Sequence, residues 1–379
     1  MNLKIFKLLF DGLKTGSKYH LDYHANKNMY PTFLAYQITD SCNSRCQMCN
    51  IWEKKPKNEL SSAEIEEVFS SRLFSKLRWL NLTGGEPFMR SDVFEIIQIL
   101  NKLPKLEGIA IPSNGFLTKR IVEVVEKSLK ILGKKKFLSV TLSIDGFEET
   151  HDEIRGVPGA YKKVMATLDE LLKLKKRYKN FNVGVQPTIS KKNIKEIEEF
   201  YEFMKENKTQ NVGFAVTMSS DGYYGNLGTK LELDKKDKKK VERFFKKIIV
   251  NDPQYAFYYL KLIDMFKTGR RNFLWLGGFL SLFMNPNGDL SPCPILSEDK
   301  DFYFGNGNSN AHYAWFSKRA TKIKRHLKNE SVCKKCQMMC DFINVAKVEF
   351  YSFGFFMMQH PVIFSKFMKK IKNMDSAYL

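Results

Sequence analysis

Short apolar runs rich in β-branched residues alternate with longer amphipathic segments from about residue 33 onward. Six runs have the length and composition of buried strands, at residues 33–39, 79–83, 108–112, 138–144, 182–187 and 212–217. Helical patterns lie between them, with a capping sequence at Ser61-Ser62-Ala63-Glu64 and a run from residue 159 to 176. Six alternations of strand and helix predict parallel strands with crossover helices. The sequence therefore predicts an α/β fold, a partial (β/α)6 barrel of the TIM type with a small cysteine-bearing C-terminal domain.

The pattern changes after the sixth predicted strand, and these changes indicate the domain borders. A glycine- and lysine-rich connector follows the barrel, and the turn sequence Asn285-Pro286-Asn287-Gly288-Asp289 opens the cysteine-bearing domain. We expect an amphipathic N-terminal extension at 1–32, the barrel at 33–220, the connector at 221–281, the cysteine-bearing domain at 282–342 and an aromatic, basic tail at 343–379.

Charge and hydropathy exclude several classes of protein. The chain has 62 Lys and Arg against 41 Asp and Glu, a net charge of +21, which favours anionic partners. The lysines are spread over expected outer helix faces and accompany no nucleic-acid motif, so we expect no specific nucleic-acid partner. The N-terminus lacks the features of a secretion signal, and no segment approaches the roughly 18 apolar residues of a membrane span. We therefore expect a cytoplasmic protein.

The two ends of the chain leave a peripheral membrane contact open. Leu3, Phe6, Phe10 and Leu13 share one helical face with lysines beside it, and the tail is also aromatic and basic. Binding to an anionic membrane surface is one interpretation, and ordinary packing of terminal helices on the barrel is the other.

The seven cysteines form two groups. Cys42, Cys46 and Cys49 directly follow the first predicted strand, and the second group consists of Cys293, Cys333, Cys336 and Cys340. In a reducing compartment such groups indicate metal ligands rather than disulfides. Three thiols leave one iron of a four-iron cluster open, whereas four complete a cluster or a zinc site. A zinc site completed by a distant residue is the alternative for the first group.

The spacing C-x3-C-x2-C resembles the radical S-adenosylmethionine (radical SAM) superfamily. Segments similar to further motifs of the family fall mostly at strand ends, namely Thr83-Gly84-Gly85-Glu86-Pro87, Ser113-Asn114-Gly115, Ser143-Ile144-Asp145-Gly146 and His151-Asp152-Glu153-Ile154-Arg155-Gly156. Singly, each could be a turn, a helix cap or a surface ion pair, but their order favours the family. Met48 departs from the family, whose members often have an aromatic residue before the third cysteine.

The resemblance implies cofactors and their ligands. The first cysteine group would hold a catalytic [4Fe-4S] cluster whose open iron binds S-adenosylmethionine. The residues implied in binding that cofactor are Gly84, Gly85, Glu86, Pro87, Ser113, Asn114, Ser143, Asp145 and Arg155. The run from residue 285 to 294 resembles the entry to a SPASM or twitch domain. Its four cysteines imply one auxiliary [4Fe-4S] cluster, with zinc as the alternative.

The resemblance also implies an enzyme, an oxidoreductase or tailoring enzyme. Its cluster would cleave S-adenosylmethionine to a 5′-deoxyadenosyl radical that takes hydrogen from a substrate, and a reductant such as flavodoxin or ferredoxin would supply the electron. The substrate stays open between a peptide, a sugar or alcohol, and a lipid intermediate. The short segment before residue 33 counts against a leader-dependent peptide modifier, and the basic ends slightly favour a lipid or other anionic metabolite. The rival is a non-catalytic iron–sulfur or zinc protein serving a partner, which leaves the strand-end motifs unexplained.

No catalytic acid or base follows from the sequence. Both cysteine groups together use all seven thiols, so we expect no free cysteine as a proton acceptor or hydrogen donor. Tyr223, Tyr224, Asp221, Glu232 and His312 are candidates that the sequence does not rank.

Overall fold

The computed structural model describes residues 3–209 and 211–328 and, beyond them, 333–334, 336–337, 344–345, 348–349, 361–362 and 364–366. Cys340, the predicted fourth ligand of the second cysteine group, lies outside these residues, as does most of the predicted tail. The predictions for both therefore stay predictions.

A curved sheet of eight strands forms the centre of the protein, in the order β10-β9-β8-β1-β2-β3-β4-β5. The strands are β1 (Phe33–Thr39), β2 (Trp79–Gly84), β3 (Gly108–Ser113), β4 (Phe137–Leu142), β5 (Phe181–Val185), β8 (Ser281–Met284), β9 (Asp289–Ser291) and β10 (Gly305–Asn306). Strands β1 to β5 and β8 run parallel, and β9 and β10 add antiparallel pairs at one edge. All seven residues of β1 are buried, as expected of a strand covered on both faces.

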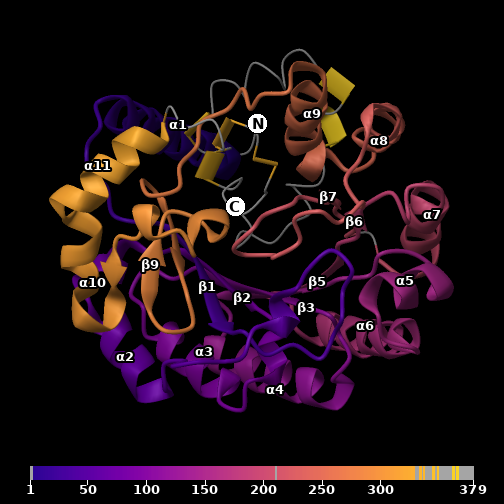
Figure 1. The fold of residues 1–379 in the computed structure, drawn as a ribbon, viewed down its shortest axis with the longest axis horizontal. Coiled ribbons are helices and arrows are strands. Elements are labelled where there is room, and N and C mark those ends of the chain that lie inside the picture. The colour runs from indigo at the N-terminus through magenta and orange to yellow at the C-terminus, as the bar shows by residue number, and fades with distance from the viewer. Residues whose placement is uncertain are drawn as a thin grey trace.

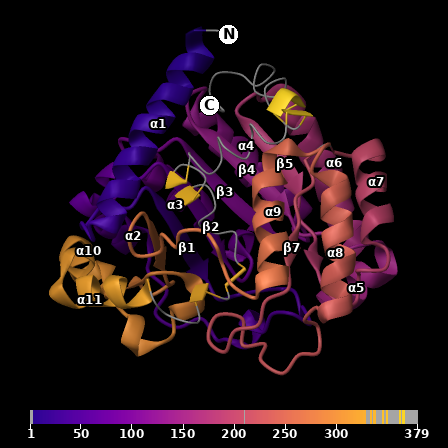
Figure 2. The ribbon, with the colours of Figure 1, turned by 90° about the horizontal axis from the view of Figure 1, so that it is seen from above.

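Helices cover the outer face of the sheet, where α2, α3, α4 and α6 lie in a row (Figure 1). The helices are α1 (Leu3–His24), α2 (Ser62–Ser70), α3 (Val93–Asn101), α4 (Thr118–Leu132), α5 (Glu148–Arg155), α6 (Ala160–Arg177), α7 (Ile197–Asn207), α8 (Lys235–Ile248), α9 (Pro253–Thr268), α10 (Gly307–Phe316) and α11 (Lys318–Leu327). Short 3-10 turns occur at Ile51–Glu53, Arg72–Lys76, Pro87–Met89, Pro294–Leu296 and Lys300–Phe302. From above, α1, α10 and α11 lie at one side of the sheet and α8 and α9 at the other (Figure 2).

The α/β fold and the partial barrel are confirmed, and so are the first five strands, apart from shifts of one or two residues at their ends. The capping prediction is also confirmed, because the Ser61 side chain accepts from the Glu64 N–H and the Glu64 carboxylate accepts from the Ser61 N–H.

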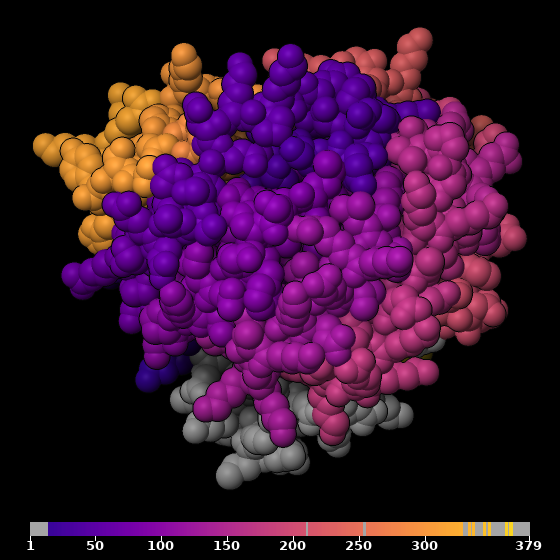
Figure 3. Space-filling model, turned by 90° about the horizontal axis from the view of Figure 1, so that it is seen from below, coloured from indigo at the N-terminus to yellow at the C-terminus, as the bar shows by residue number. Residues whose placement is uncertain are grey.

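Seen from below, the first half of the chain forms most of the surface, with the C-terminal helices at one edge (Figure 3).

The sixth predicted strand, 212–217, is confirmed in part. It runs parallel beside β5, with Val212 opposite Val185 and the Gly213 N–H donating to the Val185 carbonyl at 2.9 Å. Within it only β7 (Ala215–Val216) is a regular strand, and it pairs in parallel with β6 (Thr188–Ile189) as a separate two-stranded sheet. Pro187 lies between β5 and β6 and cannot donate to this ladder, because proline has no N–H, but its carbonyl accepts from the Ala215 N–H at 3.0 Å.

The sheet also gains β8, which the sequence did not predict. This strand pairs in parallel with β1, with Phe33 opposite Ser281 and Tyr36 opposite Met284. The segment that opens the cysteine-bearing region is therefore part of the barrel sheet. Among the described residues, no helix has the length and apolar composition needed to cross a bilayer.

Candidate functional site

The loop after β1 carries the first cysteine group and is fastened to the end of α5. The Arg45 N–H donates to the Arg155 carbonyl at 2.9 Å, and the buried Ser44 hydroxyl donates to the same carbonyl at 3.1 Å. The Ser44 Oγ also lies 3.1 Å from Cys46 Sγ, and its N–H donates to Cys42 Sγ at 3.5 Å. These bonds fix the orientation of the thiols.

All three thiols line one cavity of about 220 Å³, which we call the cofactor cavity. Six of the other residues implied in cofactor binding line it with them, namely Gly84, Gly85, Ser113, Asn114, Ser143 and Arg155. Glu86, Pro87 and Asp145 are buried and do not line it. The structure thus gathers the predicted residues into two layers, the wall of the cavity and a buried layer behind it.

The two glycines allow the end of β2 to approach the cysteine loop. Gly84 has a φ of +136°, which side chains rarely adopt, and a Cβ at Gly85 would lie 2.2 Å from the Ser41 carbonyl oxygen. The Gly85 N–H donates to the Thr39 carbonyl at 2.9 Å. Both positions therefore require glycine, Gly84 because of its φ and Gly85 because a side chain would collide with the main chain of the cysteine loop.

Glu86 connects the ends of β2 and β3 from behind the cavity. Its side chain is 1% exposed and accepts from the Phe88 N–H at 3.2 Å, the Ser113 hydroxyl at 2.9 Å and the Asn114 N–H at 2.7 Å. Burial raises the pKa of this carboxyl to about 7, and the three bonds oppose the rise. Because groups of the protein occupy its oxygens, a contact between Glu86 and the cofactor stays a prediction.

Asp145 and Arg155 form an ion pair beside the cysteine loop. Their side chains meet at 2.6 Å between Asp145 Oδ2 and Arg155 Nη2, with the carboxylate fully buried. Arg155 Nη1 donates to Cys46 Sγ at 3.5 Å, and the Thr188 N–H donates to Asp145 Oδ1 at 2.8 Å. The pair places a cation against the Cys46 thiol.

The chemistry of the donor set fits an iron–sulfur cluster. Burial raises the pKa of Cys42 to about 11 and that of Cys49 to about 12, so both thiols would be neutral at pH 7 unless a metal binds them. Across residues 3–209, 211–328 and the described residues beyond, no three His, Cys, Asp or Glu side chains are grouped as ligands of one metal ion. Ligands of zinc lie about 2.3 Å from a single atom, whereas cysteines of a four-iron cluster bind separate irons. The spacing favours the cluster.

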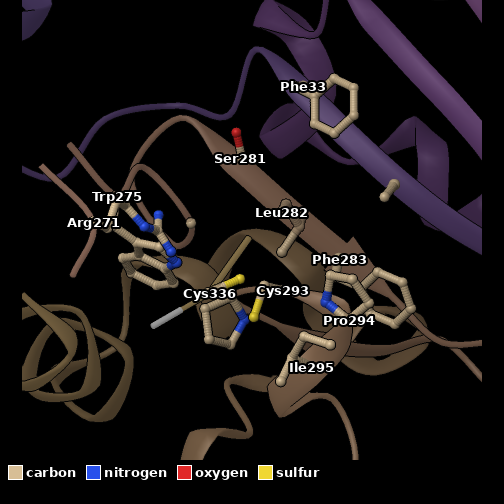
Figure 4. A pocket seen from close by; sticks show the side chains of 13 residues that line it. Phe33, Arg271, Trp275, Ser281, Leu282, Phe283, Cys293, Pro294, Ile295 and Cys336 are labelled. Carbon is tan, nitrogen blue, oxygen red and sulfur yellow. The ribbon is translucent and has the colours of Figure 1, made fainter. Parts of the chain in front are cut away.

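The second cysteine group lies apart from the cofactor cavity, because the pocket that its cysteines line shares no described residue with that cavity. Cys293 and Cys336 line one pocket, which we call the auxiliary pocket (Figure 4). The Cys336 N–H donates to the Cys333 carbonyl at 3.4 Å. Burial raises the pKa of Cys293, and the nearby Cys336 and Cys333 raise it further. The structure therefore gathers the three described cysteines of this group.

A third cavity of about 410 Å³, the central cavity, adjoins both sites. It shares Met48, Tyr223 and Tyr224 with the cofactor cavity and Phe33 and Phe283 with the auxiliary pocket. None of the described residues that line it is acidic or basic, and none is histidine.

The unranked candidates for a catalytic acid or base differ in whether they line the central cavity. Tyr223 and Tyr224 line it, whereas Asp221 and Glu232 are exposed and line neither this cavity nor the cofactor cavity. His312 lies on α10, 3.2 Å from the Tyr30 hydroxyl, and lines neither cavity.

The loop that carries Tyr223 and Tyr224, which we call the tyrosine loop, is bound to the cysteine loop by hydrogen bonds to main-chain carbonyls. The Asn50 N–H donates to the Tyr224 carbonyl at 2.7 Å, and Asn226 Nδ2 donates to the Met48 carbonyl at 2.8 Å. These bonds hold Tyr223 and Tyr224 at the border between the cofactor cavity and the central cavity.

The sequence analysis missed the lining of the central cavity. Alternate residues of β2, Asn81 and Thr83, face it, as does Thr141 of β4. Polar residues two positions apart within an otherwise apolar run were the available signal, because alternate side chains of a strand share a face. Tyr258 of α9 carried no such signal.

Two domain families match the chain: the radical SAM superfamily over residues 36–204, and the iron–sulfur cluster-binding domain SPASM over residues 276–337. The AdoMet-dependent heme synthase of Methanosarcina barkeri (strain Fusaro / DSM 804) is 32% identical over 179 residues, 46% of this chain and 48% of that protein. The sporulation killing factor maturation protein SkfB of Bacillus subtilis (strain 168) is 28% identical over 194 residues, 49% of this chain and 44% of that protein. The chain spans about half the length of these relatives.

The solved structure of native anSMEcpe with bound AdoMet is similar in fold, with a TM-score of 0.59 and 17% identity over 84% of this chain and 88% of that chain. A radical SAM domain implies a catalytic [4Fe-4S] cluster and S-adenosylmethionine, and a SPASM domain implies auxiliary iron–sulfur clusters. With both families matched, residues 36–204 form a radical SAM domain and residues 276–337 a SPASM domain.

Proposed function

We propose that this chain is a radical SAM enzyme that acts on an uncharged part of its substrate, held between the two cysteine groups. When bound, the cluster and S-adenosylmethionine supply a 5′-deoxyadenosyl radical, which takes a hydrogen atom from the substrate for oxidation or tailoring. The observation that carries the proposal is the central cavity, which adjoins both the cofactor cavity and the auxiliary pocket.

The residues of the cofactor cavity divide the binding task in this proposal. Cys42, Cys46 and Cys49 hold the cluster, and Arg155 donates to the Cys46 thiolate while Asp145 fixes the guanidinium. Gly84 and Gly85 permit close approach of the main chain, and the polar groups of Ser113, Asn114 and Ser143 face the cofactor. Met48 covers the adenine face, as an apolar and adaptable side chain can.

The lining of the central cavity favours an uncharged reacting group. A carboxylate or phosphate placed there would lose its hydration without gaining a cationic partner among the described lining residues, at a cost of several kcal/mol. The aromatic and hydroxyl side chains suit a side chain of a peptide, a neutral alcohol or the apolar part of a lipid. The preference for an anionic metabolite therefore finds no support at the reacting position.

Tyr223 and Tyr224 are the proposed groups for proton or hydrogen exchange with the substrate. Both lie where the central cavity meets the cofactor cavity, and the central cavity has no carboxylate, lysine or histidine among its described lining residues. The Tyr223 ring also contacts the ring of Phe283, at 5.7 Å between centroids, on the side of the auxiliary pocket.

Reductive cleavage of S-adenosylmethionine by anaerobically reconstituted protein tests the proposal. We expect 5′-deoxyadenosine and methionine with dithionite as reductant, and neither product from the Cys42→Ala, Cys46→Ala, Cys49→Ala triple variant. Asp221→Asn, an exposed change beside the tyrosine loop, serves as the matched control and should cleave as the wild type does. Full iron content without cleavage would favour the non-catalytic alternative.

Two partner proposals accompany this function. A reductant such as flavodoxin or ferredoxin supplies the electron in the cell, and reduction of the cluster by either protein in place of dithionite would support it. Contact of α1 with an anionic membrane rests on the sequence spacing of Leu3, Phe6, Phe10 and Leu13. Cosedimentation with anionic vesicles at low salt tests this contact, and no binding would remove it.

A further inference from the structure

Arg271 places a cation in the auxiliary pocket. It lies between α9 and β8 and is the only charged side chain among the described residues that line this pocket. Figure 4 shows it beside Trp275, on the Cys336 side of the site. Its Nε is buried and has no hydrogen-bond partner among the described residues.

The backbone of Arg271 is bound to the cysteine segment itself. Its N–H donates to the Lys334 carbonyl at 2.6 Å, and Lys334 lies between Cys333 and Cys336. The guanidinium lies 5.0 Å from the centre of the Phe273 ring, an arrangement that limits where the side chain can turn. Arg271 is therefore held against the ligand segment by main-chain and side-chain contacts.

A buried guanidinium N–H without an acceptor is costly, because the donor has lost its hydrogen bonds to water and gained none in the protein. The surrounding side chains offer little compensation, because Trp275, Leu282, Phe283 and Ile295 are apolar or aromatic. A four-iron cluster on four thiolates carries negative charge, and its sulfur atoms accept hydrogen bonds. Such a group would supply the acceptor that Arg271 lacks.

We propose that Arg271 donates a hydrogen bond to an iron–sulfur cluster held by the second cysteine group and thereby raises its reduction potential. One-electron reduction adds a negative charge to the cluster, and a nearby cation stabilises that added charge. Arg271 thus makes the cluster a better electron acceptor. The inference rests on the proposed function only in requiring a cluster at this site.

Redox titration of the auxiliary cluster, followed by electron paramagnetic resonance, tests the inference. The full-length Cys42→Ala, Cys46→Ala, Cys49→Ala variant serves as background, because it leaves only the auxiliary signal. In that background Arg271→Met should shift the midpoint potential to more negative values with the iron content unchanged. Arg270→Met removes an exposed neighbouring arginine and should leave the potential where it was.

A second variant keeps the test decisive if Arg271→Met loses its cluster. Arg271→Gln keeps a hydrogen-bond donor but no charge, so it should also shift the potential downward. An unchanged potential in either variant, with about four irons retained, would overturn the role of Arg271. If the background variant contains zinc and no iron, there is no auxiliary cluster for Arg271 to bind, and the inference is overturned for that reason. Cleavage of S-adenosylmethionine by the wild type would still support the proposed function in that case.

Discussion

Replacing Glu86 by glutamine would test the buried layer behind the cofactor cavity. The change keeps the size of the side chain but exchanges one acceptor oxygen for an NH2 group. If the amide oxygen serves the Phe88 N–H and the Ser113 hydroxyl, the NH2 group faces the Asn114 N–H, which is buried and fixed in the main chain. One orphaned donor costs about 1–3 kcal/mol, so we expect the variant to be less stable than the wild type by about that amount at pH 5.

The difference in unfolding free energy between the wild type and Glu86→Gln should narrow as the pH rises. The carboxyl has a pKa of about 7 in the folded protein against an ordinary 4.5. A raised folded pKa means that its contribution to stability is complete below 4.5 and is lost as the pH rises through 7. For the wild type this loss is roughly 2.5 kcal/mol between pH 5 and pH 8, and Glu86→Gln does not share it. At pH 8 the variant should equal the wild type within about 1 kcal/mol or exceed it.

Urea unfolding of anaerobically reconstituted protein at pH 5, 6.5 and 8 measures this difference. The pH dependence of cluster loss is common to both proteins and cancels in the difference. Glu123→Gln, an exposed change on α4, is the control and should follow the wild type at all three pH values to within about 0.5 kcal/mol. A difference in unfolding free energy that stays constant, or widens as the pH rises, would refute the reasoning that burial dominates the ionisation of Glu86.

Three further predictions concern other parts of the structure. Arg155→Met leaves the buried Asp145 carboxylate unpaired and should cost about 3–5 kcal/mol in urea unfolding, part of which the double variant with Asp145→Asn should recover. Gly85→Ala places a Cβ 2.2 Å from the Ser41 oxygen, so the cysteine loop must move, and iron analysis should show loss of the first cluster with the second retained. Burial lowers the pKa of Lys324 from 10.5 to about 7, so the unfolding free energy of the wild type should rise with pH between those values. Lys324→Met should lack this rise, and an equal slope in both proteins would contradict it.

The sequence predicted those parts of the fold that local pattern determines. Strands β1 to β5 are mainly apolar runs bounded by turn or capping residues, and such runs are recognisable one at a time. The four residues of β8 have no such signal, since their place depends on a partner far away in the chain, Phe33–Tyr36 of β1. The prediction at 212–217 is right in position, since that segment runs parallel beside β5, but Pro187 removes one donor from the ladder and only Ala215–Val216 form a regular strand.

The candidate site likewise has features that the sequence predicted and features that it did not. The order of the motifs at strand ends predicted which residues gather, because the carboxyl ends of parallel strands share one edge of a barrel. It did not predict that Glu86 and Asp145 stand behind the cavity wall, since the side on which a buried carboxylate lies is set by donors from other segments, such as Asn114 and Thr188. The aromatic lining at Tyr258 and Phe283 likewise depends on how distant segments pack.

The pairing of β8 with β1 also sets an order of events during synthesis. Phe33 leaves the ribosome roughly 250 residues before Ser281, and at about 5–20 residues per second β1 waits roughly 10–50 s for this neighbour. During that time the N–H and C=O groups on one edge of β1 have no strand to bind, next to the loop that carries Cys42, Cys46 and Cys49. A nascent chain that stalls before residue 281 would therefore present an open sheet edge, so chaperone protection of that edge should matter most before β8 is made.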